Sequence, residues 1–537
     1  MMILQFIKEK ALEKKIILSF YVFVSILSWA VGLALPYVLG RFIDQLTINP
    51  NKTIIYKFTV TMAVIAVVTV ISSYIANIQM TKIINEFSYT LKEKILEHLL
   101  EVKQKSVQGL NSSNVTQKIF SDSDEIIKFI IQNFLGVFTK TLTVIYVIVF
   151  MVKIDIELSY LFFLLTPVYF IVYKFFRKKV YDASFKYKEE QNNFFGMFVH
   201  KIDNLYDIKI NNFKNLTLNE VKNGFQKLLY QVINFSKISF GFSSIGSIIS
   251  SLFNIALVFA GGLQIINGNL TIGTFTIISN YFSTYIGSID YLLTIGKKYQ
   301  QFLVSVKRME DILKLDTEQN GKTCIKEIQE IKFENFKYGF EKDNLLIDIK
   351  TQTFQRENIY CIMGENGAGK STLINLICKV YDDYDGNIYI NDVNIKDVDI
   401  KNMRKNNIAF LEQNIIFYSN LMEENLIYGL AKYDDDMLLK YKQEFDLYEF
   451  GQDKNLTGNG IITNLSGGER QKVGLIRTFL KSSDVVILDE PSSFLDQKSI
   501  CILKKHILEL KKQNKIVILI THDKAITAIA DHILKIK

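Results

Sequence analysis

Long uncharged runs of apolar residues dominate the first 300 residues of the chain, whereas charged residues crowd the remainder. A membrane-spanning helix needs about 20 predominantly apolar residues in a row. The longest uncharged stretch, 238–289, is too long for one crossing, so we divide it at the turn signal Asn267-Gly268-Asn269. The pattern predicts six spans at approximately 16–46, 55–81, 129–152, 158–176, 238–265 and 271–296.

Positive charge is distributed unevenly among the connections between these spans. Two long connections, 82–128 and 174–237, are rich in lysine, whereas the three short connections carry little positive charge. By the positive-inside rule, both termini, the long connections and the second half of the chain lie in the cytosol, and the protein is expected in the plasma membrane. Buried helices of a large soluble protein are the alternative, which this many long runs disfavour.

The two long connections are themselves predicted to be helical. Apolar positions recur at intervals of three and four at 87–102 and 186–202, which indicates that membrane helices continue into the cytosol. Their tips would lie at 109–122 and 205–213. That position makes the tips candidates for contact with the second half of the chain.

One positive charge lies inside the predicted spans. Lys140 interrupts the third span, and an ionisable group at that depth either faces a watery cavity or pairs with another charge. Asp290 of the sixth span is the candidate partner, and a position of Lys140 near the inner headgroups is a further alternative. The sequence leaves these interpretations open.

From about Ile325 the pattern changes to short apolar strands that alternate with charged helices, which is typical of a mostly parallel α/β sheet. We therefore divide the chain into a membrane domain at 1–310, a linker at 311–324 and an α/β domain at 325–537.

The stretch 364–371 fits the pattern G-x-x-x-x-G-K-[S/T] between a strand-like and a helix-like run. Such a loop points successive backbone N–H groups at phosphates, and the helix that follows adds partial positive charge. Lys370 would reach the β- and γ-phosphates, and Ser371 can hold Mg²⁺. A solvent-facing glycine turn is the alternative, which the downstream residues disfavour.

Two further strand-like runs end in residues that suit nucleotide chemistry. The run 485–488 ends in Asp489 and Glu490, of which the first can hold Mg²⁺ and the second can polarise an attacking water. The run 516–520 delivers His522 to the same edge of the sheet.

The order of GENGAGKS, Gln413, LSGGE, VVILDEPSSFLD and His522 resembles the ATP-binding cassette of ABC transporters over about 325–537. The spans before it resemble the membrane domain of exporter-type half transporters, as do LPYVLGRFIDQL at 35–46 and NGNLTIGTF at 267–275. The resemblance implies an all-α polytopic membrane domain of six helices followed by an α/β P-loop NTPase domain. It also implies an ATPase that is coupled to transport.

The same resemblance assigns roles to individual residues. Catalysis would involve Glu490 as the general base, with His522, Gln413 and Lys370. Mg²⁺ would be held by Ser371, Gln413 and Asp489. ATP would be bound by Phe340, with Tyr338 in reserve, by Gly364, Glu365, Asn366, Gly367, Ala368, Gly369, Lys370, Ser371 and Thr372, by Ser466, Gly467, Gly468 and Glu469, and by Asp496.

A second half transporter is implied as the partner. Ser466 and Gly468 look like the signature residues that cap the γ-phosphate of the other subunit's ATP, and the chain has one cassette, so we expect a homodimer. Members of the exporter type usually carry an acidic residue just before the signature, where it touches the coupling helices. The segment 457–464 has none, so coupling is expected to use other contacts.

Composition and residue spacing argue against nucleic-acid binding, a disulfide framework and a zinc site. The formal net charge of +8 would suit nucleic acid, but the lysines lie between apolar segments and form no single basic stripe, so no nucleic-acid partner is expected. The four cysteines show no C-x-x-C spacing, which argues against a disulfide framework and a zinc site.

The leading interpretation is an exporter that hydrolyses ATP and moves an amphipathic or hydrophobic substrate, such as a peptide, a lipid or a drug-like molecule, across the lipid bilayer. The alternative is an ATP-gated channel or regulator on the same scaffold. Such proteins often lose the catalytic base, whereas Glu490 and His522 are present here. The sequence does not distinguish among the substrates.

Overall fold

The computed structural model describes residues 2–107, 112–339, 345–365, 367–419, 421–430, 432–447 and 465–536. The chain divides into two compact units. The first unit, which is helical, comprises Met1–Val102 and Gly109–Leu315. The second comprises Lys103–Gln108 and Asp316–Lys537, and it holds all the strands among the described residues.

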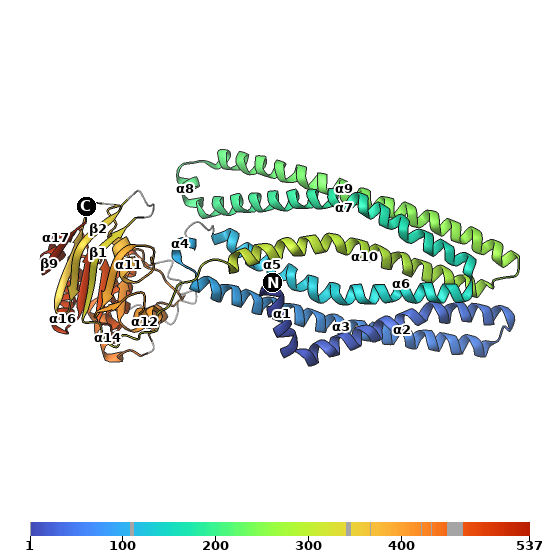
Figure 1. Cartoon of the computed structure of the whole chain (residues 1–537), viewed down its shortest axis with the longest axis horizontal. Helices are drawn as coiled ribbons and strands as arrows, with labels where there is room; N and C mark the ends of the chain where they lie inside the picture. The colour runs from blue at the N-terminus through green and yellow to red at the C-terminus, as the bar shows by residue number, and fades with distance from the viewer. Residues whose placement is uncertain are drawn as a thin grey trace. The chain divides into compact units, whose positions relative to one another are not determined.

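Long helices build the first unit (Figure 1). Helices α2 and α3 pack together, as do α7 and α9, which lie side by side in Figure 1. The helices are α1 (Met2–Glu13), α2 (Lys15–Ile48), α3 (Lys52–Glu101), α5 (Ser112–Lys128), the π-helix η1 (Phe129–Asn133), α6 (Phe134–Ile154), α7 (Ile156–Asp203), α8 (Leu205–Ile210), α9 (Lys214–Ile266) and α10 (Ile272–Leu313).

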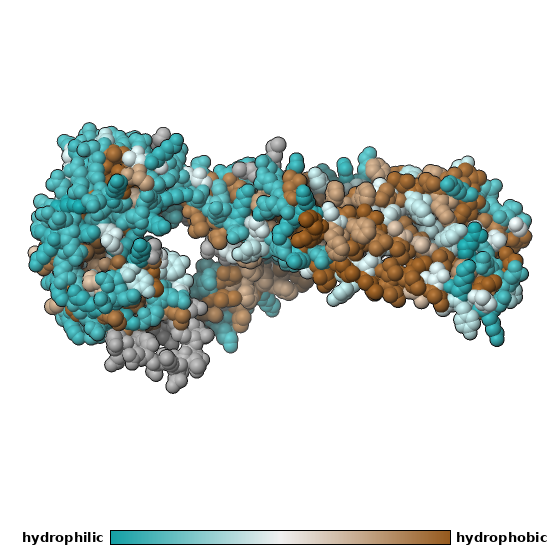
Figure 2. Space-filling view, turned by 90° about the horizontal axis from the view of Figure 1, so that it is seen from below, coloured by the Kyte–Doolittle hydropathy of each residue, from teal (hydrophilic) through white to brown (hydrophobic). Residues whose placement is uncertain are grey.

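Five helices in the described part of the chain are long and apolar enough to cross a membrane, namely Lys15–Ile48, Lys52–Glu101, Lys118–Ile154, Ile156–Asp203 and Lys214–Ile266. They contain the first five predicted spans. Figure 2 shows hydrophobic residues spread widely over this unit, whereas the visible surface of the second unit is mostly hydrophilic.

Helix α10 contains the sixth predicted span but is not among those five helices. Its apolar residues are interleaved with buried tyrosines whose hydroxyls need partners. Tyr281 donates to the carbonyl oxygen of Leu33 at 2.8 Å, and Tyr285 donates to that of Phe162 at 3.0 Å. The helix is therefore packed against α2 and α7 by polar as well as apolar contacts.

The predicted helical extensions are confirmed. Helix α3 continues to Glu101, α7 continues to Asp203, and the short helix α8 occupies the second predicted tip. The first predicted tip is only partly right, because α5 already begins at Ser112.

The two stretches that carried the resemblance in the membrane half meet where α2 packs against α10. The Asp44 carboxylate accepts a hydrogen bond from the backbone N–H of Gly273 at 2.8 Å, in the first turn of α10. Gly40 and Gly273 lie so close that a Cβ on either would overlap the backbone of the other. An acidic group at a helix N-terminus is favourable, so this contact fixes the start of α10.

Two sheets form the second unit (Figure 1). An antiparallel sheet has the order β2-β1-β4-β5, and a parallel sheet has the order β6-β7-β8-β3-β9. The strands are β1 (Glu330–Tyr338), β2 (Ile347–Gln355), β3 (Asn358–Met363), β4 (Asp385–Ile390), β5 (Val393–Asn394), β6 (Ile408–Leu411), β7 (Val485–Asp489), β8 (Ile516–Ile520) and β9 (His532–Lys535).

Helices cover both faces of the parallel sheet, and its inner strands are therefore apolar on both sides. Along β7, Val485 and Ile487 pack into one core, which includes the antiparallel sheet, while Val486 and Leu488 pack into the other. The helices of the second unit are α4 (Gln104–Val107), α11 (Lys370–Ile377), α12 (Ile400–Asn406), α13 (Met422–Leu426), α14 (Asp435–Glu444), α15 (Gly467–Leu480), α16 (Gln497–Lys512) and α17 (Lys524–Thr527).

Strand register brings the predicted chemistry to one edge of the parallel sheet. Ile520 of β8 pairs with Ile362 of β3 on one side and with Asp489 of β7 on the other. Because the strands are parallel, their carboxyl ends meet there, and the residues that follow them share that edge.

Candidate nucleotide-binding site

The loop between β3 and α11 holds the predicted phosphate-binding residues. Gly367 and Gly369 have φ values of +86° and +92°, a backbone region that side chains disfavour. A Cβ at Gly369 would also lie 3.0 Å from the side chain of Leu346. The same loop contains Gly364, Glu365 and Ala368, and the first turn of α11 contains Lys370, Ser371 and Thr372, while Asn366 lies outside the described residues.

The ammonium of Lys370 points back at this loop. Its Nζ donates hydrogen bonds to the carbonyl oxygens of Gly364 at 2.7 Å and Glu365 at 3.1 Å. It also lies 3.2 Å from Nε2 of His522, which follows β8. Neutral oxygens and an imidazole nitrogen are weaker partners for an ammonium than a phosphate oxygen is, so an anion can displace them.

Asp489 ends β7 and is buried, with 6% of its surface exposed. The hydroxyl of Ser371 donates to its Oδ2 at 3.3 Å. Burial raises the pKa of the Asp489 carboxyl, and the hydrogen bond from Ser371 opposes that rise. A hydroxyl beside a buried carboxylate is an all-oxygen donor set of the kind that Mg²⁺ prefers, so these residues fit the ion.

Glu490 follows Asp489 with a φ of +47°, which is uncommon for a residue with a side chain. Its N–H donates to the carbonyl oxygen of Ile520 at 2.8 Å, and the buried amide of Gln471 donates to the Glu490 carbonyl at 3.2 Å. The hydroxyl of Thr521 lies 3.5 Å from the Glu490 carboxylate. These contacts hold the strained backbone of Glu490 in place at the edge of the parallel sheet that carries the phosphate loop.

The signature residues begin helix α15. Ser466 is its N-cap and forms a capping box with Glu469, whose carboxylate accepts from the Ser466 N–H at 2.7 Å and from the Ser466 hydroxyl at 2.9 Å. Gly467 and Gly468 form the first turn, where a Cβ on Gly468 would lie 2.8 Å from the Phe494 carbonyl oxygen. Such a helix start offers N–H groups and partial positive charge to a phosphate.

Two further predicted residues lie around this helix start. Asp496 is the N-cap of α16, and the hydrogen bond from the backbone N–H of Ser499 at 2.7 Å lowers the pKa of its carboxyl. Gln413 lines a hollow of about 350 Å³ together with Gly467 and Phe494. Within the described residues, no hydrogen bond joins Gln413 to Ser371 or Asp489, the other two predicted metal ligands.

Tyr338, the reserve candidate for stacking on adenine, ends strand β1. Its side chain is 5% exposed, and its ring stacks on Tyr381 with centroids 5.7 Å apart. Burial raises the pKa of Tyr338 to about 12. Strand alternation turns Tyr338 inward with Phe336, and its role toward adenine stays a prediction. Phe340 lies outside the described residues.

Helix α4 belongs to the second unit, where it contacts the segment after α11. Nζ of Lys103 lies 2.8 Å from the carboxylate of Asp382, and Nζ of Lys105 lies 3.0 Å from that of Asp383. The backbone N–H of Lys103 also donates to the carbonyl oxygen of Asp316 at 2.9 Å. The contact is therefore made just before the predicted tip at 109–122.

The sequence pattern gave no role to Gln471, Thr521 or this pair of lysines. Gln471 lies two residues after LSGGE and Thr521 lies directly before His522, so the neighbouring motif residues were a signal for them. Lys103 and Lys105 carried no signal of their own, because their partners lie more than 270 residues away in the sequence.

Lys140 and Asp290 form no ion pair in the described part of the chain, although α6 and α10 pack together. Lys140 is half-buried and Asp290 is exposed. The pair that the sequence left open is therefore not formed in this structure, and the role of Lys140 stays a prediction.

A helical membrane region and an α/β nucleotide-binding domain, fused in one chain, define an ABC transporter. The family model described as "ABC transporter transmembrane region" matches residues 18–289, and the one described as "ABC transporter" matches residues 348–493. The chain belongs to this family and is an ATPase coupled to transport. The family and the fold class inferred from the sequence are confirmed.

The chain is similar to exporters over nearly its full length. It is 24% identical to an ATP-dependent lipid A-core flippase of Haemophilus ducreyi, over 95% of this chain and 89% of the relative. It is 22% identical to the lactococcin-G-processing and transport ATP-binding protein LagD of Lactococcus lactis subsp. lactis, over 94% and 72%. The structure of a bacterial Atm1-family ABC exporter with ATP bound shares its fold, with a TM-score of 0.86 and 18% identity, over 98% of this chain and 94% of that one.

Proposed function

We propose that the chain is one half of a homodimeric pump that uses ATP to export an amphipathic or hydrophobic substrate across the plasma membrane. One observation carries the proposal. The phosphate loop, Asp489, Glu490 and His522 share one sheet edge, whereas Ser466 starts a separate helix that makes no hydrogen bond to that loop among the described residues. A second copy would bring its own Ser466 to this edge.

Each group then has a distinct task in ATP hydrolysis. Lys370 and the loop N–H groups bind the β- and γ-phosphates, in exchange for the carbonyls that Lys370 contacts here. Glu490 accepts a proton from the attacking water, and His522 contacts the γ-phosphate. Ser466 of the partner subunit donates to the same phosphate from the helix start.

Mg²⁺ would be held by Ser371, Asp489 and Gln413, where it would neutralise charge on the phosphates. The Ser371 hydroxyl and the Asp489 carboxylate already lie together at the loop. Gln413 would join them from the hollow beside α15.

Two observations favour a pump over a gated channel. Glu490, the proposed general base, and His522 are both present, and they lie at the sheet edge that carries the phosphate loop. The relatives named above are an ATP-dependent flippase and a processing and transport ATP-binding protein, and neither is described as a channel. The lysine-rich connections support cytosolic cassettes.

The homodimer is tested with the purified chain alone. It should hydrolyse ATP without any second protein, and ATP should increase the dimer fraction measured by mass photometry in detergent. In proteoliposomes, ATP added on the cassette side should move a fluorescent short-chain phospholipid to the opposite leaflet. A chain that stays monomeric and inactive until a different half transporter is added would contradict the homodimer.

The segment 103–107, which contains α4, is proposed to pass the motion of the cassette to the membrane helices. It lies between α3 and α5 in the sequence, and its two lysines pair with Asp382 and Asp383. These contacts supply the coupling that the missing acidic residue before the signature would otherwise provide. Since this short segment is held by two ion pairs, its contact with the cassette is sensitive to a change of charge.

Lys103→Glu should reduce ATP-driven transport by about fivefold, because it places a second carboxylate against Asp382, while basal ATP hydrolysis should persist. Adding Asp382→Lys should restore transport by rebuilding the pair with its charges reversed. Both rates are measured on one proteoliposome preparation.

Lys105→Glu is the matched control for this prediction. Lys105 and Asp383 are 59% and 82% exposed, so water screens their pair and the change should have little effect. If both substitutions reduced transport equally, or if Asp382→Lys did not restore it, coupling through the Lys103–Asp382 pair would be contradicted.

A further inference from the structure

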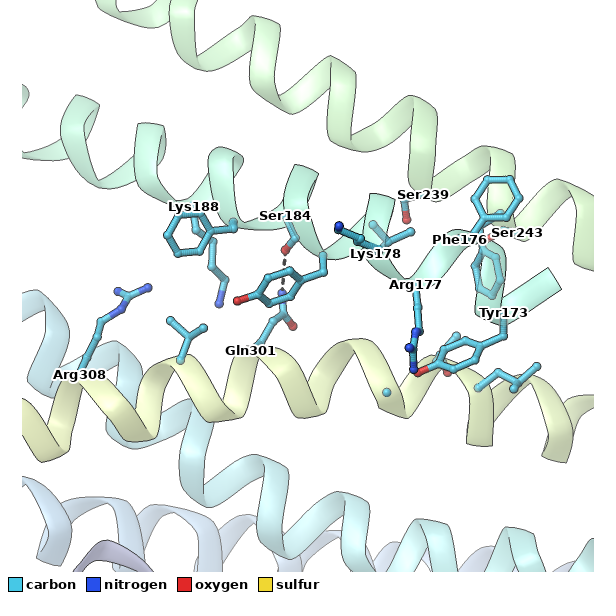
Figure 3. A pocket seen from close by; sticks show the side chains of 18 residues that line it. Tyr173, Phe176, Arg177, Lys178, Ser184, Lys188, Ser239, Ser243, Gln301 and Arg308 are labelled. Carbon is cyan, nitrogen blue, oxygen red and sulfur yellow. Dashed lines mark hydrogen bonds between the residues drawn. The ribbon is translucent and has the colours of Figure 1, made fainter. Parts of the chain in front are cut away.

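A cavity of about 350 Å³ lies among α7, α9 and α10 in the helical unit (Figure 3). Its lining falls where three predicted spans end on the cytosolic side. Phe176 closes the fourth predicted span, Ser239 opens the fifth, and Gly296 closes the sixth. The cavity therefore straddles the level at which hydrocarbon gives way to lipid headgroups.

The charges that line the cavity have one sign. Arg177, Lys178, Lys188 and Arg308 contribute to the wall, and no aspartate or glutamate does so among the described residues. Figure 3 shows that the Arg177 side chain extends from α7 toward α10. The neighbouring Lys178 side chain also projects from α7. Such a wall attracts an anion and repels a cation.

Two of these cations are already engaged. Lys188 pairs with Glu125 at 3.0 Å, and Arg308 lies 3.8 Å from Asp122. Arg177 and Lys178 have no carboxylate within ion-pair distance in the described part of the chain, and both side chains are exposed. The charge that remains for a ligand is therefore on Arg177 and Lys178.

The rest of the wall is apolar or neutral. The rings of Phe176 and Phe242 lie 5.8 Å apart and face the cavity from α7 and α9. The amide of Gln301 donates to the Ser184 hydroxyl at 3.3 Å, as the dashed line in Figure 3 shows. Gly296 leaves room for the Tyr173 hydroxyl, which a Cβ there would overlap. A hydrocarbon chain fits this part of the cavity, and a charged group does not.

We propose that the cavity binds the head and upper chain of an anionic amphiphile, a molecule with a phosphate or carboxylate head on a hydrocarbon tail, with Arg177 and Lys178 on the head and the Phe176 and Phe242 rings on the tail. This assignment rests on the proposed function, in which the cargo is amphipathic, and it adds the sign of the cargo's charge. Guanidinium and ammonium groups beside an apolar wall are the donors that such a head selects.

Interfacial lysines and arginines also occur simply to anchor a helix at the headgroups. That explanation treats all cations at the end of this span alike. Lys174 and Lys179 lie on the same helix beside Arg177 and Lys178, yet neither lines the cavity. Paired substitutions on this one helix therefore separate the two explanations at equal loss of charge.

The test measures binding to the purified full chain in an uncharged detergent, without nucleotide. A fluorescent single-chain alkyl phosphate is the probe, and its anisotropy is followed on titration. Unlabelled alkyl phosphate should displace it, whereas an alkyl phosphocholine of the same length and inorganic phosphate alone should not. Displacement by phosphocholine at equal concentration would overturn the charge requirement, and displacement by inorganic phosphate would overturn the requirement for a tail.

Arg177→Gln with Lys178→Gln should weaken probe binding by about tenfold or more, because both head contacts are lost. Lys174→Gln with Lys179→Gln should change it by less than about twofold, since the pair removes only long-range attraction and a Lys179 ammonium that lies 6.0 Å from the Phe176 ring, at the limit of a cation–π contact. Equal weakening by the two pairs would overturn the site. Ser243→Trp fills the cavity from α9 without changing its charge, and it should also weaken binding; unchanged binding in a folded Ser243→Trp protein would count against the cavity as the location.

Because no nucleotide is present, this result is independent of transport. A chain that binds the alkyl phosphate but neither hydrolyses ATP nor moves phospholipid would refute the proposed pump and leave the site standing. A chain that transports phospholipid but does not bind the alkyl phosphate would refute the site and leave the pump standing.

Discussion

Glu490→Gln should leave ATP binding intact and lower ATP turnover by about 100-fold or more, because an amide cannot accept the proton of the attacking water. The hydrogen bonds that hold Glu490 in place do not require the charge of its carboxylate. The backbone of Glu490 is held by Ile520 and Gln471, and the Thr521 hydroxyl can donate to an amide oxygen as well as to a carboxylate. The substitution should therefore remove the base without moving it. Phosphate release and nucleotide binding are measured on the same purified dimer.

Glu469→Gln is the matched control, since it makes the same chemical change on the signature side. Glu469 serves the capping box of α15, and a glutamine oxygen can accept from the Ser466 N–H as the carboxylate does. Turnover should therefore stay near that of the unchanged chain. Phosphate release from Glu490→Gln at the normal rate, with the ATP-bound dimer failing to accumulate, would show that another group is the base.

The nucleotide-binding edge could be predicted from local sequence because its chemistry lies next to strand ends. Asp489 and His522 follow strands whose residues are all buried, and parallel strands end at one edge. The phosphate loop carries its own backbone requirements in Gly367 and Gly369. Short-range pattern and strand direction were enough to group these residues.

Side-chain orientation was harder to predict. Tyr338 lies two residues before Phe340, and only the register of β1 against β2 and β4 shows that its ring enters the core. Lys140 and Asp290 belong to helices that do pack together, but the sequence does not give the rotation of each helix about its axis. For that reason the sequence could not decide between pairing and contact with cargo, and the role of Lys140 stays a prediction.

Contacts across long sequence distances could not be predicted at all. Lys103 pairs with Asp382 only because the second unit folds these distant segments together. The cavity beside Arg177 forms only when α7, α9 and α10 pack together. Neither feature has a local motif. Both depend on tertiary packing, which single-sequence patterns of hydrophobicity and charge do not specify.

Lys370→Ala and Ser466→Arg should each abolish ATP turnover in a homodimer, for different reasons. Lys370→Ala removes the ammonium that replaces carbonyl partners with phosphate, so ATP affinity falls as well. Ser466→Arg puts a bulky side chain at the start of α15, where the partner's phosphate would sit. Since symmetry repeats each lesion, both sites of either dimer are lost.

Mixing the two variants should restore activity, because a mixed dimer gathers both lesions in one site. Its other site combines the intact phosphate loop of the Ser466→Arg chain with the intact signature of the Lys370→Ala chain. With random pairing, about half of the dimers are mixed and each keeps one of two sites, so we expect about a quarter of the normal phosphate release. Dimer exchange is verified with two affinity tags.

Lys370→Ala mixed with Glu490→Gln is the control that makes this result specific. Lys370 and Glu490 both lie at the sheet edge of their own chain, so such a mixed dimer carries one lesion in each site and should recover nothing. Recovery in the first mixture and not in the second requires that Ser466 act on the other subunit's nucleotide. Equal recovery in both mixtures, or none in the first among dimers shown to have exchanged, would mean that the two sites are not shared in this way.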